Sequence, residues 1–516
     1  MKIDTLYSHP VKASKPFQYM LGFIDWRSLC AFSFPFMVYL LTLTPTIYNL
    51  DSAELTVAAA TAGLTRSTGY PLYLMLGHLW SYIPIGDIGY RLNLFSAFNG
   101  AFTIMLTERI LRHLGLGSWP TFGALGLLAC GVYFWSLSLI AEVYTLHTVL
   151  MALMILLLLR WADQPSAQKL ALVGLVTGLS MGHHAATVLL IPGVVFYVLT
   201  TAPRMALHWR SMIFVAGAFA MGLAVYLYLP LRYTANPPFN YAGLYDSSGV
   251  FEPINLHTIQ GLWWLVSGQA FVSHMLVYSE LNLWRELTQF GTYVWQSFFA
   301  VGVGPALVGI VVLARHNWRL CTMLGLMFTV HAAFYLGYRV IDKETMFLPT
   351  FLIWAIWLGV GYQWLLTWIQ EDRQSQGAML EVWFLRVGMA AAVGVAIVWN
   401  WPLVDRADDW SVRERSEQML EQVQPDALIL GWWGVAPPIE YLQLVEGYRP
   451  DVQIINRFLI GQDDMSRLIA TEASRRPVYI DTLIIDLPAY LEVRKQGTLY
   501  RVQPKSKPVS SGVRPE

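Results

Sequence analysis

Residues 48–73 read YNLDSAELTVAAATAGLTRSTGYPLY and directly follow the first long apolar run of the chain, at about 28–47. This stretch places two carboxylates, Asp51 and Glu54, at the end of that run. A charged side chain at the end of a membrane span is less costly than one at mid-bilayer, but it is still usually there for a partner. We therefore interpret this stretch as the reactive centre, which the other segments hold in place.

The composition indicates a polytopic membrane protein. The 516 residues are 55% hydrophobic and only 13% charged, with a mean hydropathy of +0.46, which is too apolar for a soluble chain of this length. The 34 basic and 34 acidic residues balance, so no net charge points to nucleic acid. The three cysteines, Cys30, Cys130 and Cys321, all lie in apolar runs, so we expect no disulfide framework.

The apolar runs predict about eleven membrane spans, since about 20 apolar residues cross a bilayer as a helix. They lie at roughly 28–47, 92–112, 119–138, 141–160, 168–182, 184–201, 210–230, 290–314, 319–338, 346–369 and 383–401. We expect the first to be an uncleaved span. The short runs of 168–201 are either two spans, one broken helix or a re-entrant pair.

The basic residues predict the orientation. The N-terminal side of these spans holds Lys2, Lys12, Lys15, Arg27, Arg109, Arg112, Arg160, Lys169, Arg204, Arg210, Arg315, Arg319 and Arg373. The opposite short loops hold only Arg66, Arg91, Arg232, Arg285, Arg339 and Lys343. By the positive-inside rule the N-terminal segment 1–27 is cytoplasmic. The outer loops 48–91 and 231–289 of the membrane domain 28–401 then lie outside.

The composition becomes soluble after Trp401. Helical and strand patterns alternate from there, with a buried strand expected at 427–430 and further strands at 452–455, 477–481 and 497–503. This alternation predicts a small extracytoplasmic α/β domain over residues 402–503. The end of the chain, 504–516, has the composition of a disordered tail.

Asp51 and Glu54 are three residues apart, so a helix would present both carboxylates on one face. As a general base, Asp51 would remove a proton from an attacking hydroxyl, an effect typically worth about 100- to 10,000-fold in rate. The alternative is a capping box that only starts a helix. The neighbouring Arg66, Gly69 and Pro71 favour the functional interpretation, because a cap does not need them.

Glu142 opens the predicted span at 141–160 and faces the same outer side as Asp51. It would hold an acceptor or a divalent cation, or it is a helix-start carboxylate favoured by the macrodipole. His183 and His184 lie at another outer turn. Adjacent histidines of a regular helix cannot face one ligand, so we expect no metal site from the pair, and one of them to contact a phosphate or a sugar hydroxyl.

A phosphate at the outer face would need cations, and the candidates are Arg232, Arg339 and Lys343. Arginine offers a planar fork that matches phosphate oxygens. The alternative is snorkelling toward lipid headgroups, which is equally good for Lys343 between Asp342 and Glu344. The turn GWWG at 431–434 lacks the spacing of a nucleotide-binding loop.

Five motifs together resemble one family: DSAE at 51–54, GYPLY at 69–73, RLN at 91–93, EVY at 142–144 and YLPLR at 228–232. This is the multi-span domain-of-unknown-function 2723 family, which includes a eukaryotic transmembrane protein O-mannosyltransferase and belongs to the GT-C superfamily. The likeness covers residues 28–345, and more loosely the tail around 441–452.

The resemblance implies a GT-C fold, a polyprenyl-phosphate sugar donor and inversion at the anomeric carbon. It implies that Asp51 is the base and that Glu54 matches the family's second carboxylate. Tyr70, Arg91 and Tyr144 fall inside the shared motifs, so they become candidate substrate contacts.

The chain departs from the family in one loop. It has RST at 66–68 where the family has His-Pro-Pro. Arg66 therefore becomes a candidate phosphate contact, and the identity of the sugar stays open.

These inferences predict an inverting glycosyltransferase that moves a hexose, with mannose the first candidate, from a polyprenyl-phosphate carrier to a hydroxyl, such as that of a protein Ser or Thr, at the extracytoplasmic face. One alternative is transfer to a lipid or cell-envelope glycan. Another is a transporter or flippase, which would show repeated halves, and we find no repeat. A divalent cation is not required, because arginines can stabilise the leaving group. The expected partners are donor, acceptor and bilayer, without nucleic acid.

Overall fold

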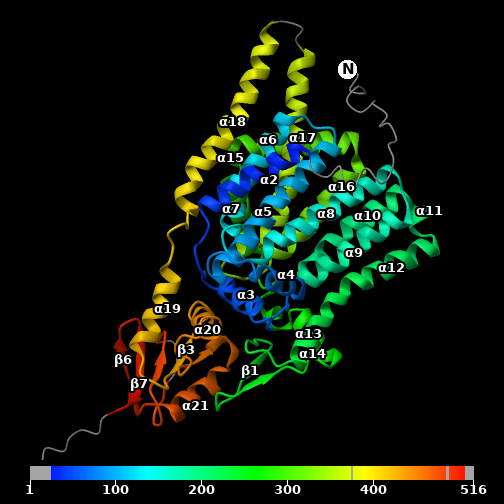
Figure 1. The fold of residues 1–516 in the computed structure, drawn as a ribbon. Helices are drawn as coiled ribbons and strands as arrows, with labels where there is room; N and C mark the ends of the chain where they lie inside the picture. Colours follow the sequence, from blue (N-terminus) through cyan, green and yellow to red (C-terminus); the bar gives the residue numbers. More distant parts are fainter. Residues whose placement is uncertain (1–24, 373–375, 484–486, 506–516) are drawn as a thin grey trace, which may run out of the picture.

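The structure, a computed structural model, describes residues 25–372, 376–483 and 487–505. Most of the predicted N-terminal segment and of the predicted tail, residues 1–24 and 506–516, lie outside the described residues. Figure 1 shows a large helical body, with a smaller part of strands and helices at one end that contains the C-terminal residues.

Helices make up the body. In chain order they are α2 (Trp26–Leu41), α3 (Asp51–Ala60), α4 (Pro71–Ser81), α5 (Ile88–His113), α6 (Ser118–Cys130), α7 (Val132–Leu137), α8 (Val143–Asp163), α9 (Ala167–His183), η2 (Ala185–Leu190), α10 (Ile191–Thr201), α11 (Pro203–Ala206), α12 (Trp209–Leu223), η3 (Ala224–Leu227), α13 (Tyr228–Thr234), α14 (Ile259–Val266), η4 (Gln269–His274), α15 (Glu280–His316), α16 (Trp318–Leu336), η5 (Lys343–Phe347), α17 (Leu348–Asp372) and α18 (Gln376–Val404).

Six helical segments of the described chain are long and apolar enough to cross a membrane: Val143–Asp163, Trp209–Thr234, Asn282–His316, Trp318–Leu336, Lys343–Gln370 and Met379–Val404. Two shorter apolar helices, Trp26–Leu41 and Ala185–Thr201, add to them. The predicted run at 119–138 is divided at Gly131, where the extended backbone separates α6 from α7. The fold is therefore that of a polytopic helical membrane protein, and the number of eleven spans stays a prediction.

Burial distinguishes central helices from peripheral ones. The apolar windows of the segments at 143–163 and 343–370 are 83% and 89% buried, so α8 and α17 form the centre of the body. The windows at 209–234 and 379–404 are only 11% and 22% buried, so these segments expose apolar side chains as lipid-facing helices do. Figure 1 shows α18 along the outside of the body, leading into α19.

Glycines allow two helix pairs to approach closely. A Cβ atom on Gly361 of α17 would lie 1.8 Å from the Pro305 carbonyl oxygen of α15, and one on Gly309 would lie 1.9 Å from the Trp357 carbonyl oxygen. Gly222 of α12 meets the α9 backbone in the same way. Small residues at such crossings are typical of helix packing in membranes.

The C-terminal residues form a mixed five-stranded sheet with three helices. The strands are β3 (Leu428–Gly431), β4 (Gln453–Asn456), β5 (Val478–Ile480), β6 (Leu491–Gln496) and β7 (Leu499–Pro504), in the order β4-β3-β5-β7-β6. Strand β3 pairs parallel with β4 and β5, while β7 runs antiparallel to β5 and β6. The helices are α19 (Ser411–Gln422), α20 (Ala436–Leu444) and α21 (Gln462–Glu472). Strand β3, which lies inside the sheet between β4 and β5, is completely buried, as a strand covered on both faces should be.

The C-terminal part contacts both outer loops. Helix α20 packs against α3 of the first loop. The second loop contributes the hairpin of β1 (Gly243–Tyr245) and β2 (Phe251–Pro253), and Tyr245 bridges to Ile460 after β4. Figure 1 shows this hairpin beside α21. The segments that hold Asp51 therefore lie between the helical body and the C-terminal sheet.

Candidate active site

A cavity of about 480 Å³ lies beside the start of α3, between the helical body, the second outer loop and the C-terminal sheet. The predicted site residues on its wall are Asp51, Arg66, Tyr70, Tyr144, His184 and Arg339. They come from α3, the following loop, α8, the turn before η2 and the segment after α16. The fold thus gathers residues that the sequence distributes over most of the membrane part.

Asp51 is the first residue of α3, and it is bound to Arg66. The Arg66 Nη2 atom lies 2.8 Å from Asp51 Oδ1, and Arg66 Nε lies 3.6 Å from Glu54 Oε2. The N-cap residue is Leu50, and no side chain caps the helix, so the capping-box alternative is not the arrangement found. The Asp51 side chain keeps 37% of its surface exposed, so it is accessible from the cavity.

Glu54 plays a different part from Asp51. Its side chain is 3% exposed, and its Oε1 atom accepts a hydrogen bond of 3.1 Å from the Arg66 backbone N–H. Burial raises the pKa of Glu54 from 4.5 to about 8, although Arg66 acts in the opposite direction. Glu54 is therefore protonated at neutral pH, and the charge of Arg66 acts chiefly on Asp51.

Aromatic rings enclose Arg66. Its guanidinium carbon lies 3.6 Å from the ring centroid of Trp433 and 5.0 Å from that of Phe271. Burial opposes the charge of Arg66, but Asp51 and Glu54 more than offset this and raise its pKa. A cation held between rings and carboxylates is a fixed charge at the cavity wall.

Tyr70, Tyr144 and His184 form the aromatic side nearest the helical body. The His184 ring centroid lies 5.6 Å from that of Tyr70 and 6.0 Å from that of Tyr144. Tyr70 has a positive φ of 40° before Pro71, and Leu50 before Asp51 has a φ of 55°. Positive φ is uncommon for such residues and clusters at functional sites, and both residues line this cavity.

Asp342 is a cavity residue that the sequence analysis did not select. It follows Arg339 on the wall formed after α16. Burial raises the pKa of Asp342 to about 6, with the charge of Asp51 as the next cause. The run RVIDKE at 339–344 contains Asp342, but in the sequence Asp342 was considered only as a neighbour of Lys343.

Lys343 instead binds away from the cavity. Its Nζ atom lies 2.7 Å from Glu286 Oε2, and only 5% of the residue is exposed. Arg232 is not part of the cavity wall either, because its Nε donates to the Ala62 carbonyl at 2.5 Å. Both cations therefore hold segments of the fold together, and neither has the cavity access that a phosphate contact needs.

Three further candidates lie behind or beside the wall. Arg91 donates to the carbonyl oxygens of Ser81, Ile85 and Gly86, which closes the turn between α4 and α5. The Nε2 atom of His183 lies 2.8 Å from the Val143 carbonyl oxygen, and His183 is not on the cavity wall, whereas His184 is. Glu142 immediately precedes α8, with its backbone N–H bound to Ser96 and only 6% of the residue exposed.

The described residues contain no group of three or more His, Cys, Asp or Glu side chains placed to hold a metal ion.

The C-terminal part also contributes to the wall. Trp432, Trp433 and Phe458 line the cavity opposite the helical body. In the sequence, the turn at 431–434 is recognisable only as lacking the spacing of a nucleotide-binding loop. No local pattern indicated that it would meet α3, because this contact joins segments distant in the chain.

Residues 51–207 match the family described as "Protein O-mannosyl-transferase TMEM260 N-terminal domain". Protein O-mannosyl-transferase TMEM260 of Mus musculus is 25% identical over 469 residues, which cover 84% of this chain and 63% of that protein. Protein O-mannosyl-transferase tmem260 of Dictyostelium discoideum is 21% identical over 467 residues, 81% of this chain and 56% of that protein. The chain thus spans less than two thirds of the length of these curated relatives.

Two solved structures have a similar fold. The crystal structure of ArnT from Cupriavidus metallidurans bound to undecaprenyl phosphate gives a TM-score of 0.53 at 12% identity, covering 95% of this chain and 98% of that chain. The arabinofuranosyltransferase AftD from Mycobacteria gives 0.51 at 15% identity, covering 93% and 40%. The predicted GT-C fold and the resemblance to a family with O-mannosyltransferase members are therefore confirmed.

Proposed function

We propose that the chain is an inverting glycosyltransferase that moves a hexose, with mannose the first candidate, from a polyprenyl-phosphate carrier to a Ser or Thr hydroxyl of a polypeptide at the extracytoplasmic face. One observation carries the proposal: Asp51 lies in a cavity between apolar helices and a folded C-terminal part, paired with Arg66 and near Arg339 and Asp342. The curated relatives named protein O-mannosyl-transferases support the choice of sugar and acceptor.

The reaction moves one proton and one sugar. The acceptor oxygen attacks the anomeric carbon, and the bond between that carbon and the phosphate oxygen breaks. The bonding pair stays on the phosphate, so polyprenyl phosphate leaves as an anion, and the hydroxyl proton passes to Asp51. Attack opposite to the leaving group inverts the anomeric carbon. Arg66 orients Asp51 for this step through the 2.8 Å contact.

Arg339 is the best candidate to contact the donor phosphate. Arg66 is already engaged by Asp51, Glu54 and Trp433. Arg339 lines the same cavity and belongs to the exposed residues. An arginine fork near a poorly hydrated phosphate stabilises the charge that develops as the bond breaks.

The lipid chain of the donor would lie toward the helical body. Val188 and Leu189 of η2 and Phe334 of α16 extend the cavity wall on that side with apolar surface. ArnT, which shares the fold, was crystallised with undecaprenyl phosphate. Likeness of fold does not by itself transfer a ligand, so the donor class is argued from this apolar wall together with the cations.

The outer location of the reaction rests on the distribution of basic residues. The loops that carry Asp51 and Arg339 lie on the side with fewer basic residues, which the positive-inside rule assigns to the exterior. The C-terminal part lies on the same side, since it contacts α3 directly.

The test uses purified full-length protein with a synthetic polyprenyl-phosphate mannose and Ser/Thr-containing peptides. We expect mannosylated peptide whose anomeric configuration is opposite to that of the donor, as read by NMR. Retained configuration, or no release of sugar from the donor, would refute the proposal. Transfer only to a lipid or glycan acceptor would support the proposed transferase activity and would refute the polypeptide as its acceptor.

A further inference from the structure

The C-terminal sheet presents aromatic side chains at one edge. Trp432 and Trp433 follow β3, and Phe458 lies in η6 (Arg457–Leu459), which follows β4. Strands β3 and β4 are paired and parallel, so their carboxyl ends meet at the same edge. Ligands of open α/β sheets commonly bind outside the carboxyl ends of the strands. Here that edge lines the cavity that contains Asp51.

A carboxylate fixes this edge. Asp481 directly follows β5, the third parallel strand, and its Oδ2 atom accepts a 2.7 Å hydrogen bond from the Trp432 backbone N–H. Its Oδ1 atom lies 3.5 Å from Arg457 Nε, next to Phe458. Asp481 therefore joins the ends of three strands and holds both aromatic segments in one arrangement.

The same edge fits closely against the first outer loop. A Cβ atom on Gly434 would lie 2.7 Å from the Asn49 Oδ1 atom, so the turn after β3 is in contact with the segment that leads into Asp51. Asn49 Oδ1 also accepts a 2.9 Å hydrogen bond from the Leu50 N–H. The aromatic edge and the proposed base are thus neighbours.

The three rings have different surroundings. Trp433 is 4% exposed and stacks on Arg66, and its Nε1–H has no acceptor among the residues that the structure describes. Trp432 is half-buried, and Phe458 is 59% exposed. Trp433 therefore supports Arg66, whereas Trp432 and Phe458 offer accessible ring surface at the cavity.

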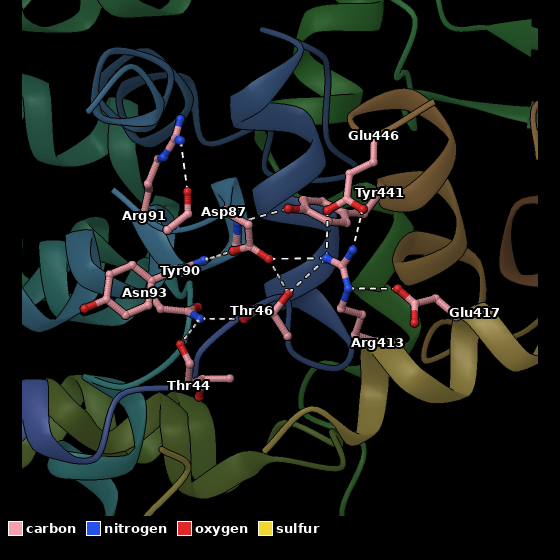
Figure 2. Close-up of polar contacts among 12 residues, drawn as sticks. Thr44, Thr46, Asp87, Tyr90, Arg91, Asn93, Arg413, Glu417, Tyr441 and Glu446 are labelled. Carbon is pink, nitrogen blue, oxygen red and sulfur yellow. Dashed lines mark hydrogen bonds and ion pairs between the residues drawn. The ribbon is translucent and has the colours of Figure 1, made fainter. Parts of the chain in front are cut away.

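An ion-pair network holds the C-terminal part in this position. Arg413 of α19 lies 3.3 Å from Asp87 Oδ2 and binds Glu446 through two nitrogens at 2.7 and 2.5 Å. Asp87 is the N-cap of α5, and its Oδ1 atom accepts a 2.7 Å bond from the Tyr90 N–H. Figure 2 shows Arg413 between Asp87 on one side and Glu446 and Glu417 on the other.

Two more contacts support this placement. The Gly89 N–H donates to the Tyr441 hydroxyl of α20 at 3.3 Å. The Tyr241 hydroxyl of the second outer loop donates to the buried Glu440 of α20. The C-terminal part is therefore attached to both outer loops, and the position of its aromatic edge over the cavity is fixed by specific side chains.

We propose that this edge is the acceptor wall of the active site, that Trp432 and Phe458 contact residues beside the target Ser or Thr of an extended polypeptide, and that Arg413 is a positioning residue that holds the wall over Asp51. The inference rests on the proposed function and names the surface that binds its acceptor.

The chemistry of the wall favours a polypeptide over a glycan. Extended peptides of the proline-rich, polyproline II type dock in aromatic-lined grooves. The Phe458 ring has no hydrogen-bonding group, and the indole N–H of Trp432 is the single side-chain donor that the two accessible rings carry. A sugar buries several hydroxyls, each of which costs free energy unless it is hydrogen-bonded, and these rings supply few partners.

The experiment measures peptide mannosylation and, separately, hydrolysis of the donor by water, with full-length protein in bilayer nanodiscs. We expect Phe458→Ala and Trp432→Ala each to raise the peptide KM about tenfold, with donor hydrolysis unchanged. The matched control is Tyr490→Ala, which removes an exposed ring of the C-terminal part outside the cavity wall. Unchanged donor hydrolysis also establishes that each variant is folded.

The role of Arg413 is tested by the same comparison of the peptide KM with the rate of donor hydrolysis. We expect Arg413→Ala to raise the peptide KM about tenfold without changing donor hydrolysis, and Arg413→Lys to restore part of it, because lysine keeps one ion pair. Glu417→Gln removes only the neighbour on α19 and leaves the KM unchanged.

The two proposals fail differently. If the wild-type protein releases no sugar from the donor, the proposed function is wrong. If it mannosylates peptides while Phe458→Ala and Trp432→Ala retain the wild-type KM, only the acceptor wall is refuted. If these variants raise the KM of a glycan acceptor while peptides are not substrates, the polypeptide assignment is overturned.

Discussion

Replacing Arg66 tests whether its pair with Asp51 organises the site. Arg66→Met keeps much of the side-chain volume but removes the 2.8 Å contact to Asp51, the 3.6 Å contact to Glu54 and the cation stacked on Trp433. The backbone hydrogen bond from residue 66 to Glu54 is retained. The change is therefore confined to the guanidinium group.

The expected magnitude follows from these contacts. A hydrogen bond to a charged group is worth about 1.5–3 kcal/mol, and the lower end applies because Asp51 is 37% exposed. The stacked cation adds about 0.5–1 kcal/mol. The sum, about 2–2.5 kcal/mol, corresponds to a loss of roughly 30- to 70-fold in kcat/KM. Arg66→Lys keeps the charge and should lose only about threefold to tenfold.

The assay is the initial rate of mannose transfer to peptide at subsaturating donor. Arg494→Met is the control, because Arg494 is a largely exposed arginine paired only with Glu492 among the ion pairs of the described chain. An Arg66→Met enzyme within about threefold of wild type would mean that Asp51 is oriented by something else.

Three further predictions concern pH and packing. The pKa of Glu54 is raised from 4.5 to about 8 in the folded state, so its contribution to stability is present below pH 4.5 and is lost as pH rises through 8. In a melting series, the melting temperature of Glu54→Gln should therefore fall less than that of wild type between about pH 6 and about pH 9. Parallel curves of melting temperature against pH would contradict this. The pKa of Asp342 is raised to about 6, and we expect Asp342→Asn to remove a step near that pH from the profile of transfer rate against pH; persistence of the step would assign it to another group. Gly361→Ala puts a Cβ atom 1.8 Å from a carbonyl oxygen of α15, so it should lower the free energy of unfolding by about 3 kcal/mol. The control Gly388→Ala, whose Cβ atom would have nothing within 4 Å, should leave the free energy of unfolding unchanged. Equal melting temperatures of the two variants would refute the close contact of α15 and α17.

The helical body was the most predictable feature, because hydropathy alone determines which segments avoid water. The apolar run at 141–160 corresponds to α8 and the run at 346–369 to α17. Breaks within runs were less visible. Gly131 has an extended backbone that separates α6 from α7, and a single glycine inside an apolar run does not predict such a break.

The sequence could predict the local part of the site but not the distant part. Asp51, Glu54 and Arg66 lie in one short stretch, and the structure brings them together. The stacking of Trp433 on Arg66 joins two segments that are far apart in the sequence. Patterns of residue spacing predict only contacts between residues that are close in the sequence.

The cations show why residue type alone was insufficient. Arg339 lines the cavity, whereas Arg232 and Lys343 bind Ala62 and Glu286. All three follow apolar runs and look alike in the sequence, and only the packing of their loops separates them. In the C-terminal part, β6 was missed because its sequence LEVRKQ contains three charged residues and only its first residue is buried, which resembles a loop.

The most direct test of the account is the rate of sugar transfer by Asp51→Asn. Asparagine keeps the size and position of the side chain next to Arg66 but cannot accept the acceptor's proton. We predict a loss of at least about 100-fold in kcat, with the Kd for the polyprenyl-phosphate donor changed little. An Asp51→Asn protein that transfers mannose at a rate within about threefold of wild type would contradict the claim that Asp51 is the base.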